Sequence, residues 1–432
     1  MNRREFVKSS AVFSAMMASA PSILNAQGKR TFNVALVGCG GRGNGAAGNL
    51  VEAAKIVGVE VKFVAAADYF VDKAKAFAKK MNFDEKNCFG GTNGYKAAIA
   101  VPGVDIVILT TPLNFRAIHL KACIDAGKHV FAEKGVAVDG ATVRLFIQAS
   151  KEAAAKHLTI VAGTQRRHQR GYRLQAKAIA EGKVGPILGG AVYWNGSVPW
   201  VKEREEGESN ASYLCKNWLN FTELSGDHIC EQHVHNIDIA NWFLGRYPKT
   251  ALCFGMRARR FSGNQYDMFS TDFDYGDDVH IHSMCRQIDG CYGGVYEKFR
   301  TADAVISGGG KIIKNGQPMD LQGDFQDGNP YVVEHCDLLR SIMGTGPYYN
   351  EGEAVAMSTA CAVIARISAC TGQIVRMSDI LENDKSPFYN MDCVPTPADF
   401  EKYEAEGKDV AMPQYADNQF PLPGKPWRGL KK

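Results

Sequence analysis

The sequence has few of the features that mark specialised classes of protein. None of its 12 cysteines lies in a Cys-x-x-Cys pair, so neither a zinc ribbon nor a disulfide framework is indicated. The 50 Lys and Arg residues nearly balance the 46 Asp and Glu residues, which argues against a nucleic-acid or membrane partner held by bulk charge. There is no internal repeat. Hydrophobic residues make up 45% of the 432 residues and charged residues 22%, which predicts a globular protein of two or three domains.

Residues 1–26 are typical of a targeting signal. Asn2 to Lys8 read NRREFVK, which resembles the bacterial twin-arginine signal, and an Ala/Met-rich stretch and a small-residue cleavage pattern at Leu24–Ala26 follow. The apolar stretch is too short and too polar to span a bilayer, and it holds no Cys for a lipid anchor. We therefore predict a signal peptide, a periplasmic location and no membrane anchor, against the alternative of a disordered basic tail.

A strand and a glycine-rich turn open the remaining sequence. Residues 31–37 are a β-branched apolar run, and the run Gly38-Cys39-Gly40-Gly41-Arg42-Gly43 follows directly, before a predicted helix over 44–57. Gly38 would make the tight turn, Gly40 would let the backbone approach a pyrophosphate, and Gly43 would let the helix pack closely on the strand. The helix N-terminus would offer free N–H groups to the phosphates. The pattern predicts a dinucleotide site, against the alternative of a structural turn.

Asp68 refines that prediction. It ends the next predicted strand, 61–67, and lies 25 residues beyond Gly43. A carboxylate there would accept hydrogen bonds from the ribose hydroxyls and would repel a 2′-phosphate. We therefore expect NAD, with NADP less favoured. The positive charge of Arg42 would reduce this preference for NAD.

Strands and helices continue to alternate up to residue 163, which predicts a doubly wound parallel sheet. The later segments 187–194, 251–260, 269–275, 278–285 and 291–299 read as strands of a mainly antiparallel sheet. The fold class is therefore α/β, an N-terminal Rossmann domain followed by an α+β domain. The predicted boundaries are 1–26 for the signal, 28–160 for the dinucleotide domain, 161–376 for the substrate domain and 377–432 for a Pro-rich, irregular C-terminal arm.

Several motifs together resemble the Gfo/Idh/MocA oxidoreductases. They are Gly38–Gly43, Thr111-Pro112, Ala126–Val130, Glu133-Lys134, Gly182–Gly185, and His235–Asp238 before Trp242–Gly245. The likeness runs from about residue 31 to about 375. It implies a nicotinamide enzyme that oxidises or reduces a sugar or polyol hydroxyl. It also implies cofactor contacts from Gly41, Arg42, Thr111, Pro112, Arg116 and Glu133.

Lys134 is the first catalytic candidate, because the resemblance places it beside the nicotinamide and the reacting hydroxyl. Gly135 stands where the family usually has proline, and Arg116 stands where it often has histidine. A lysine at a sheet rim can act as an acid, a base or a hydrogen-bond anchor. The structural alternative is a solvated surface lysine.

The polar cluster 225–238 supplies the other candidates. With a helix predicted from Glu231 onward, Glu231 and His235 lie one turn apart on one face, so the carboxylate would orient the imidazole as a base. His233 stands where the family has glycine. Two alternatives remain: buried or surface histidines without a role, and a metal site formed by His228, Glu231, His233 and His235. We assign no metal, since His233 and His235 would point to opposite sides of such a helix.

Weaker candidates lie at the same predicted rim. Arg167 and His168 follow a strand within the crevice and would bind sugar hydroxyls, as would His233, while Trp218 would stack on a sugar face. Arg166 is a further candidate for binding sugar hydroxyls, and Trp194 is a further candidate for stacking on a sugar face.

The sequence thus predicts an exported NAD-dependent carbohydrate oxidoreductase, with tightly bound cofactor and a homo-oligomeric state. A redox-type glycosidase or lyase that passes through a keto-sugar is one alternative. A metal-dependent hydrolase and an inactive sugar-binding protein are the others.

Overall fold

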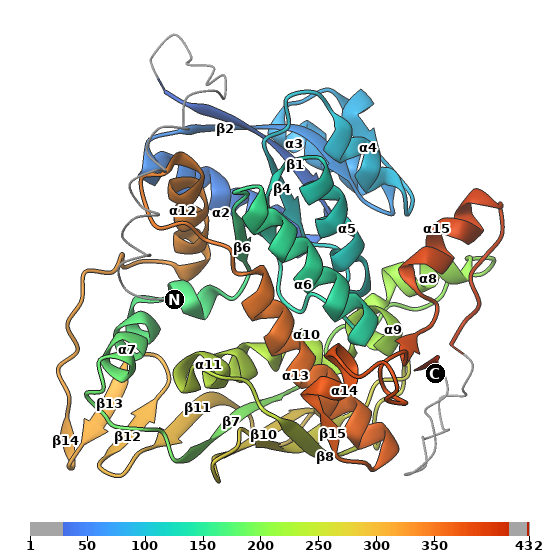
Figure 1. Cartoon of the computed structure of the whole chain (residues 1–432). Helices are drawn as coiled ribbons and strands as arrows, with labels where there is room; N and C mark the ends of the chain where they lie inside the picture. The colour runs from blue at the N-terminus through green and yellow to red at the C-terminus, as the bar shows by residue number, and fades with distance from the viewer. Residues whose placement is uncertain (1–28, 414–429, 432) are drawn as a thin grey trace.

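A computed structural model describes residues 29–413 and 430–431 of the chain. The predicted signal at 1–26 and part of the predicted C-terminal arm lie outside these residues. The described chain forms two large sheets with helices packed between and around them (Figure 1).

The first sheet confirms the predicted Rossmann architecture. Its strands are β1 (Thr31–Val37), β2 (Glu60–Ala67), β3 (Cys88–Phe89), β4 (Ile106–Leu109), β5 (His129–Ala132) and β6 (Ile160–Ala162). They are all parallel, in the order β3-β2-β1-β4-β5-β6. Its helices are α2 (Gly41–Val57), α3 (Val71–Met81), α4 (Gly94–Ala100), α5 (Leu113–Asp125) and α6 (Gly140–Ala155). Buried alanines on α2 and α6 let these helices pack closely on both faces.

The second sheet is mixed and mainly antiparallel, as expected. Its strands are β7 (Gly189–Gly196), β8 (Thr250–Met256), β9 (Met268–Asp274), β10 (His280–Gln287), β11 (Gly294–Arg300), β12 (Ala304–Ser307), β13 (Lys311–Lys314), β14 (Gln317–Pro318) and β15 (Val375–Arg376). The order is β14-β13-β12-β11-β7-β10-β9-β8-β15, and only β7 and β10 are parallel neighbours. The strands bury alternate residues, so one face packs on helices and the other meets solvent.

Short helices lie between several of the strands. The connection from the first sheet to the second contains η3 (Gln165–His168) and α7 (Arg170–Ala180). The segment between β7 and β8 contains α8 (Asn210–Lys216), η4 (Trp218–Asn220), α9 (Thr222–Ser225), α10 (Asp227–Glu231) and α11 (Val234–Leu244), and η2 (Glu85–Asn87) precedes β3. The helix predicted to start at Glu231 is therefore wrong at its N-terminus, because α10 ends at Glu231 and α11 begins at Val234.

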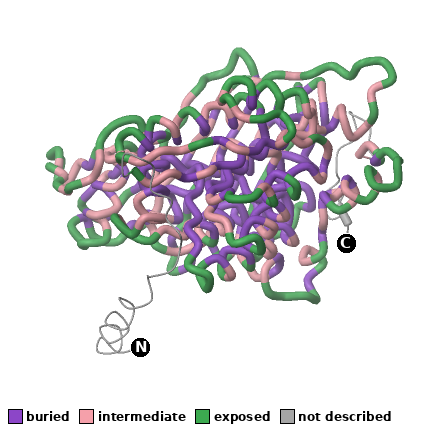
Figure 2. Tube along the Cα trace, turned by 90° about the horizontal axis from the view of Figure 1, so that it is seen from above, coloured by how far each residue is buried: buried purple, intermediate pink, exposed green. Residues whose placement is uncertain are grey.

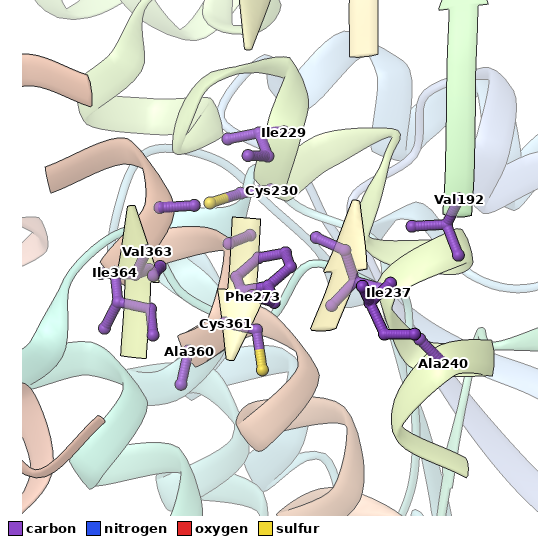
Figure 3. Close-up of a cluster of buried hydrophobic side chains, with 14 of the residues drawn as sticks. Val192, Ile229, Cys230, Ile237, Ala240, Phe273, Ala360, Cys361, Val363 and Ile364 are labelled. Atoms are coloured by element: carbon purple, nitrogen blue, oxygen red, sulfur yellow. The ribbon is translucent and has the colours of Figure 1, made fainter. Parts of the chain in front are cut away.

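Two later helices complete the cores of the two sheets. Helix α13 (Gly352–Thr371) packs with α11 above the second sheet; its Ala360, Cys361, Val363 and Ile364 meet Ile237, Ala240 and Phe273 (Figure 3). Its length and apolarity would also suit a membrane span, but 83% of its most apolar window is buried in the protein. Helix α12 (Pro330–Met343), capped by Asn329, packs instead on the first sheet, where Val332 and Leu339 share a core with Leu50. Buried residues accordingly run through the middle of the molecule (Figure 2).

The described part of the C-terminal arm is more regular than expected. It contains α14 (Met377–Leu381), β16 (Asp392–Cys393) and α15 (Pro397–Ala405), and β16 pairs with β17 (Leu430–Lys431). It packs on its own chain: the Arg144 guanidinium donates to the carbonyl oxygens of Ile380 and Tyr389. The Pro-rich composition therefore did not indicate these short helices and strands, which pack against the rest of the fold. The predicted domain boundaries stay a prediction.

Candidate functional site: a dinucleotide cavity beside a polar rim

The glycine-rich turn lies between β1 and α2, as predicted. Gly38 has φ +97°, and a Cβ there would lie 2.7 Å from the backbone of Thr110 on the neighbouring strand. A Cβ on Gly40 would meet nothing within 4 Å, so open space faces that residue. Helix α2 begins at Gly41 without a side-chain cap and without an acidic residue in its first turn. This N-terminus is therefore suited to an anionic group such as a pyrophosphate.

Asp68 lies at the same edge of the sheet. Its Oδ2 accepts a hydrogen bond from the Cys39 N–H at 2.7 Å, and its Oδ1 accepts one from the Phe70 N–H at 3.0 Å. These bonds fix the carboxylate against the glycine turn, where it lines a cavity. The position suits a ribose contact.

That cavity combines predicted and unpredicted residues. Gly38, Gly40, Asp68, Thr111 and Pro112 line it, as expected. Sequence reasoning missed a second group, which is mostly aromatic or apolar: Tyr69, Phe70, Lys73, Gly91, Thr92, Thr110, Phe115, His119 and Cys215. Tyr69 and Phe70 directly follow Asp68, and that adjacency was an available signal. The glycines at one end and the aromatic walls at the other fit a dinucleotide, with its pyrophosphate on α2 and its adenosine among the rings.

His119 is the missed residue with the clearest environment. Its ring packs against Tyr95, with centroids 4.0 Å apart and planes tilted by 35°, and its Nδ1 lies 3.1 Å from the Thr111 hydroxyl. Burial lowers the pKa of His119 to about 3, so the ring is neutral near pH 7. Phe115 and His119 lie four positions apart on α5, and both line the cavity.

Two predicted contact residues lie in surroundings that the sequence did not indicate. Trp218 lines the dinucleotide cavity, because η4 follows α8 over that cavity, and its stacking on a sugar stays a prediction. Arg116 does not line the cavity; it is buried and donates to the carbonyl oxygens of Glu133, Lys134 and Gly135. Burial lowers the pKa of Arg116 to about 10, despite the nearby Glu133 carboxylate. Arg116 thus positions the Lys134 turn.

Arg42 and Glu133 pair with each other. The Arg42 Nε lies 2.6 Å from the Glu133 Oε1, and the guanidinium lies 5.1 Å from the centre of the Tyr331 ring. Neither residue belongs to the lining of the cavity described above. Their predicted cofactor contacts, like those of Gly41 and Gly43, remain predictions.

Lys134 lies at the end of β5, beside the β4 turn that carries Thr111 and Pro112. Its ammonium donates to the Glu231 Oε1 at 2.9 Å and also to the Glu231 carbonyl oxygen. Gly135 has φ +46°, and a Cβ there would lie 2.7 Å from the Cys230 carbonyl oxygen. Proline fixes φ near −65°, so this turn excludes the proline that the resemblance leads one to expect.

His235 lies close to this pair. It lies in the first turn of α11, is buried, and stacks on Trp194 with ring centroids 5.7 Å apart and planes 22° apart. Burial, and after it the Lys134 charge, holds the pKa of His235 well below its usual range. The predicted Glu231–His235 hydrogen bond is not formed, because the two residues lie on different helices and Glu231 pairs with Lys134.

Two other residues that were predicted to contact a sugar have hydrogen-bond partners within the protein. The His233 Nε2 lies 2.7 Å from the Ser283 hydroxyl, deep against β10, and burial lowers its pKa to about 3. His168 is enclosed, with its ring nitrogens 2.7 Å from Asp337 and 3.3 Å from Glu351. Both histidines therefore have buried partners within the protein, and their contacts with a sugar stay predictions.

Arg167 and Arg166 also have partners. Arg167 forms a two-point pair with Asp238, at 2.7 and 2.8 Å. Arg166 pairs with Glu297, which also accepts from the Tyr172 hydroxyl at 2.9 Å. The Arg166 guanidinium lies 5.6 Å from the Trp194 ring centre, so it shares the Trp194 surface with His235. Only the tertiary structure brings these residues together.

The structure does not assemble the rival metal site. Within residues 29–413 and 430–431, no group of three or more His, Cys, Asp or Glu side chains is arranged to hold a metal ion. His228 pairs with Asp227, His233 lies within hydrogen-bond distance of Ser283, and His235 stacks on Trp194.

Known proteins resemble the chain in two ways. Residues 32–163 match the model of the Gfo/Idh/MocA oxidoreductase family, which is described as having an NAD-binding Rossmann fold. The 2,7-anhydro-N-acetylneuraminate hydratase of Escherichia coli (strain K12) is 30% identical over 178 residues, or 40% of this chain and 43% of the relative. An inositol 2-dehydrogenase of Salmonella paratyphi B is 28% identical over 197 residues, 45% of this chain and 50% of the relative. The chain therefore spans half or less of these relatives' length.

A solved structure supports the overall fold. The aldose-aldose oxidoreductase of Caulobacter crescentus, complexed with glycerol, superposes with a TM-score of 0.64 at 17% identity. The superposition covers 80% of this chain and all of that one. The likeness thus extends beyond the first sheet to the second. Residues 32–163 thus match the NAD-binding Rossmann model of the Gfo/Idh/MocA oxidoreductases, and the superposition shows that the chain shares its fold with a solved oxidoreductase.

Proposed function

We propose that this protein is an NAD-dependent oxidoreductase that acts on a CH–OH group of a sugar, glycoside or polyol. The observation that carries the proposal is the position of the Lys134–Glu231 pair and the neutral His235 at the rim next to the dinucleotide cavity. Relatives named for action on inositol and on an anhydro-sugar support the same substrate class.

The cofactor would be held by the residues already described. The α2 N-terminus would receive the pyrophosphate, Asp68 the ribose hydroxyls, and the aromatic walls the adenine. When bound, the nicotinamide would accept or return the hydride of the carbinol carbon. The Asp68 carboxylate favours NAD over NADP, because it would repel a 2′-phosphate.

The chain's own residues would handle the proton. An ammonium has three hydrogens, and Lys134 donates two of them to Glu231, which leaves one for a substrate hydroxyl oxygen. The pKa of His235 is lowered by burial, so the neutral ring can accept a proton from a hydroxyl near pH 7. Arg116 keeps the Lys134 turn in place through three carbonyl oxygens.

The charge balance of the rim favours an uncharged substrate. Lys134, Arg166 and Arg167 each pair with a carboxylate: Glu231, Glu297 and Asp238, respectively. A carboxylate or phosphate on the substrate would have to compete with these existing partners. We therefore expect neutral polyols and glycosides to be turned over faster than hexuronates or sugar phosphates of the same ring.

A second candidate is a closed redox cycle, in which the same sugar is oxidised and then reduced after an elimination or hydration. The matched relative named as a hydratase favours it. Two measurements separate the candidates. A dehydrogenase converts NAD to NADH in step with a keto-sugar. A closed cycle gives a rearranged or cleaved product with no net NADH.

The direct test is mass spectrometry of the denatured, natively purified protein, followed by a screen of neutral sugars. About one NAD per chain supports the proposal and shows that the cofactor stays bound through purification. Protein that neither carries nor binds NAD(H) overturns the proposal. Turnover of the sugar without any dinucleotide would also overturn it.

We also propose that the chain is exported by a twin-arginine route, from the motif at Arg3 and Arg4. Export of a folded chain would carry the cofactor out already bound. Replacement of both arginines by Lys should retain the protein in the cell. Unchanged export of that variant, or exported protein without dinucleotide, would contradict the proposal.

Finally, we propose a homo-oligomer. Leu252, Phe254 and Met256 of β8 expose their side chains on the outer face of the second sheet, and Phe254 is 74% exposed. A two-fold interface places one patch against its own copy, so an apolar patch is self-complementary. Light scattering should report a dimer or larger, and Phe254→Asp should shift the mass downward; a monomeric wild type would exclude the proposal.

A further inference from the structure

The dinucleotide cavity is bordered by a segment from the far end of the chain. Figure 1 shows α15 beside α8, at the side of the molecule where α4 and α5 lie. The segment Pro397–Val410, here called the C-terminal latch, consists of α15 and the turn after it. It contacts both walls of the cavity, and these contacts come from separate parts of the sequence.

The first contact is with the turn that carries Thr92. The Glu404 carboxylate accepts hydrogen bonds from the Thr92 N–H, at 2.9 Å, and from the Thr92 hydroxyl. Glu401 accepts from the Tyr95 hydroxyl at 2.8 Å and pairs with Lys96 at 2.7 Å. Thr92 lines the dinucleotide cavity, so Glu404 acts on a wall of that cavity.

The second contact is with α8. The Asp409 carboxylate accepts from the backbone N–H groups of Asn210 and Ala211, at 2.5 and 2.9 Å. The Asn210 side chain donates in return to the Val410 carbonyl oxygen at 2.8 Å. A carboxylate at a helix N-terminus is favourable, and α8 is the helix that brings Cys215 to the cavity.

An apolar cluster joins the two contacts. Phe400 of the latch meets Phe115 edge to face, with ring centroids 5.2 Å apart, and Val410 packs in the same cluster. Phe115 and Trp218 both belong to this cluster and line the cavity. The latch therefore holds the α8–η4 segment against α5 from the outside.

We propose that the C-terminal latch controls exchange of the dinucleotide at its adenosine end. While Glu404 and Asp409 keep their partners, α8 and Trp218 stay over the adenosine site; the dinucleotide leaves only when these contacts open. The inference rests on the proposed function, since it assigns a gate to that same site. The latch has no contact with Lys134, Glu231 or His235 among the hydrogen bonds and ion pairs described, so it would change cofactor exchange and not the chemical step.

The test is the release rate of bound NADH from the full-length protein, followed by fluorescence after a chase with excess NAD. The variant Glu404→Ala/Asp409→Ala loses the carboxylate contacts of the latch with Thr92 and with the N-terminus of α8, and it should release NADH at least about tenfold faster, because hydrogen bonds to charged groups are the stronger ones. Turnover at saturating NAD should stay within about twofold. Glu406→Gln is the matched control, since Glu406 lies in the latch and pairs only with Lys408, at 2.9 Å.

The milder pair Glu404→Gln/Asp409→Asn covers the case in which the double alanine variant does not fold; it should give an intermediate release rate. Amide hydrogen exchange at Thr92, Asn210 and Ala211 should also speed up in both variants and not in the control. Equal NADH release from wild type and the folded variants would overturn the latch while leaving the dinucleotide site intact. A wild type that does not bind NADH would overturn the proposed function itself.

Discussion

Lys134 and Glu231 form an ion pair, with the Lys134 Nζ 2.9 Å from the Glu231 Oε1, across 97 positions of sequence. The lysine lies two residues beyond the end of β5 in the first sheet, and the glutamate ends the short helix α10, which packs on α13 and on β10 of the second sheet. The pair is largely buried, with side-chain exposures of 12% and 11%. It therefore joins the two halves of the protein at the point where the proposed chemistry takes place.

Lys134→Ala should reduce turnover by about 10²–10⁴-fold, which is the usual cost of losing a positioned acid, base or hydrogen-bond donor. NADH binding should change little, because Lys134 lies outside the cavity lined by Gly38 and Asp68. Lys128→Ala is the control, since Lys128 lies at the other end of β5 and donates to the Val104 carbonyl oxygen. Steady-state kinetics would refute the role of Lys134 if the variant kept more than about a tenth of wild-type turnover.

Asp68→Asn should weaken NAD binding and bring the NAD and NADP affinities closer together. The asparagine removes the negative charge that disfavours a 2′-phosphate, yet it keeps an oxygen that can accept from the Cys39 N–H. Asp68→Ala loses that acceptor too, and it should disorder the glycine turn as well. Titration with both dinucleotides gives the ratio; an unchanged preference in the asparagine variant would place Asp68 away from the ribose.

The pH profile of kcat/KM should show no histidine limb near pH 6.5. Burial holds the pKa of His235 well below that value, so the unprotonated ring, which is the form able to accept a proton, persists as the pH falls through 6.5. His235→Asn should lower kcat/KM at every pH without moving a limb. A limb near 6.5 that disappears in this variant would show that the ring titrates normally.

His335→Phe should make the protein less sensitive to acid. His335 is buried against Phe131, with ring centroids 4.2 Å apart, and its pKa is lowered by burial to about 3. Between the folded pKa and the unfolded value of about 6.5, the unfolded chain binds one more proton. Stability is therefore lost as the pH falls below about 6.5.

Phenylalanine cannot take up that proton. Relative to pH 8, the unfolding free energy of the variant at pH 5 should exceed that of the wild type by about 2 kcal/mol. Denaturant titrations at the two pH values measure this difference. Parallel losses in wild type and variant would mean that His335 does not contribute to the acid sensitivity.

The local part of the fold could be predicted from the sequence. Alternating apolar runs and helical stretches predicted both sheets, and the predicted strand 31–37 agrees with β1 at both ends. Gly38 and Asp68 also lie as expected, because a strand, a turn and a helix fix the position of residues close to them in sequence. The position of Lys134 could be predicted for the same reason, because it lies two residues after β5 at the same edge of the sheet.

Contacts between distant segments could not be predicted in this way. Whether a polar side chain meets solvent or a buried partner depends on what packs over it. His168 follows a rim strand but is enclosed by Asp337 and Glu351, which come from α12 and the turn before α13. Glu231 pairs with Lys134 and not with its predicted partner His235, because the helix is broken between these two residues.

The sequence by itself determined the two-sheet architecture and the glycine-rich turn between β1 and α2, because hydrophobic period, glycine spacing and strand ends are local signals. Only the tertiary structure decided which charges pair, which histidines are buried and neutral, and what closes the cavity. The C-terminal latch is the clearest case: Glu404 lies 312 positions from Thr92, and no local pattern records that contact. Such pairings are selected by the global packing of the core, in which each buried polar group must find a partner wherever the chain supplies one.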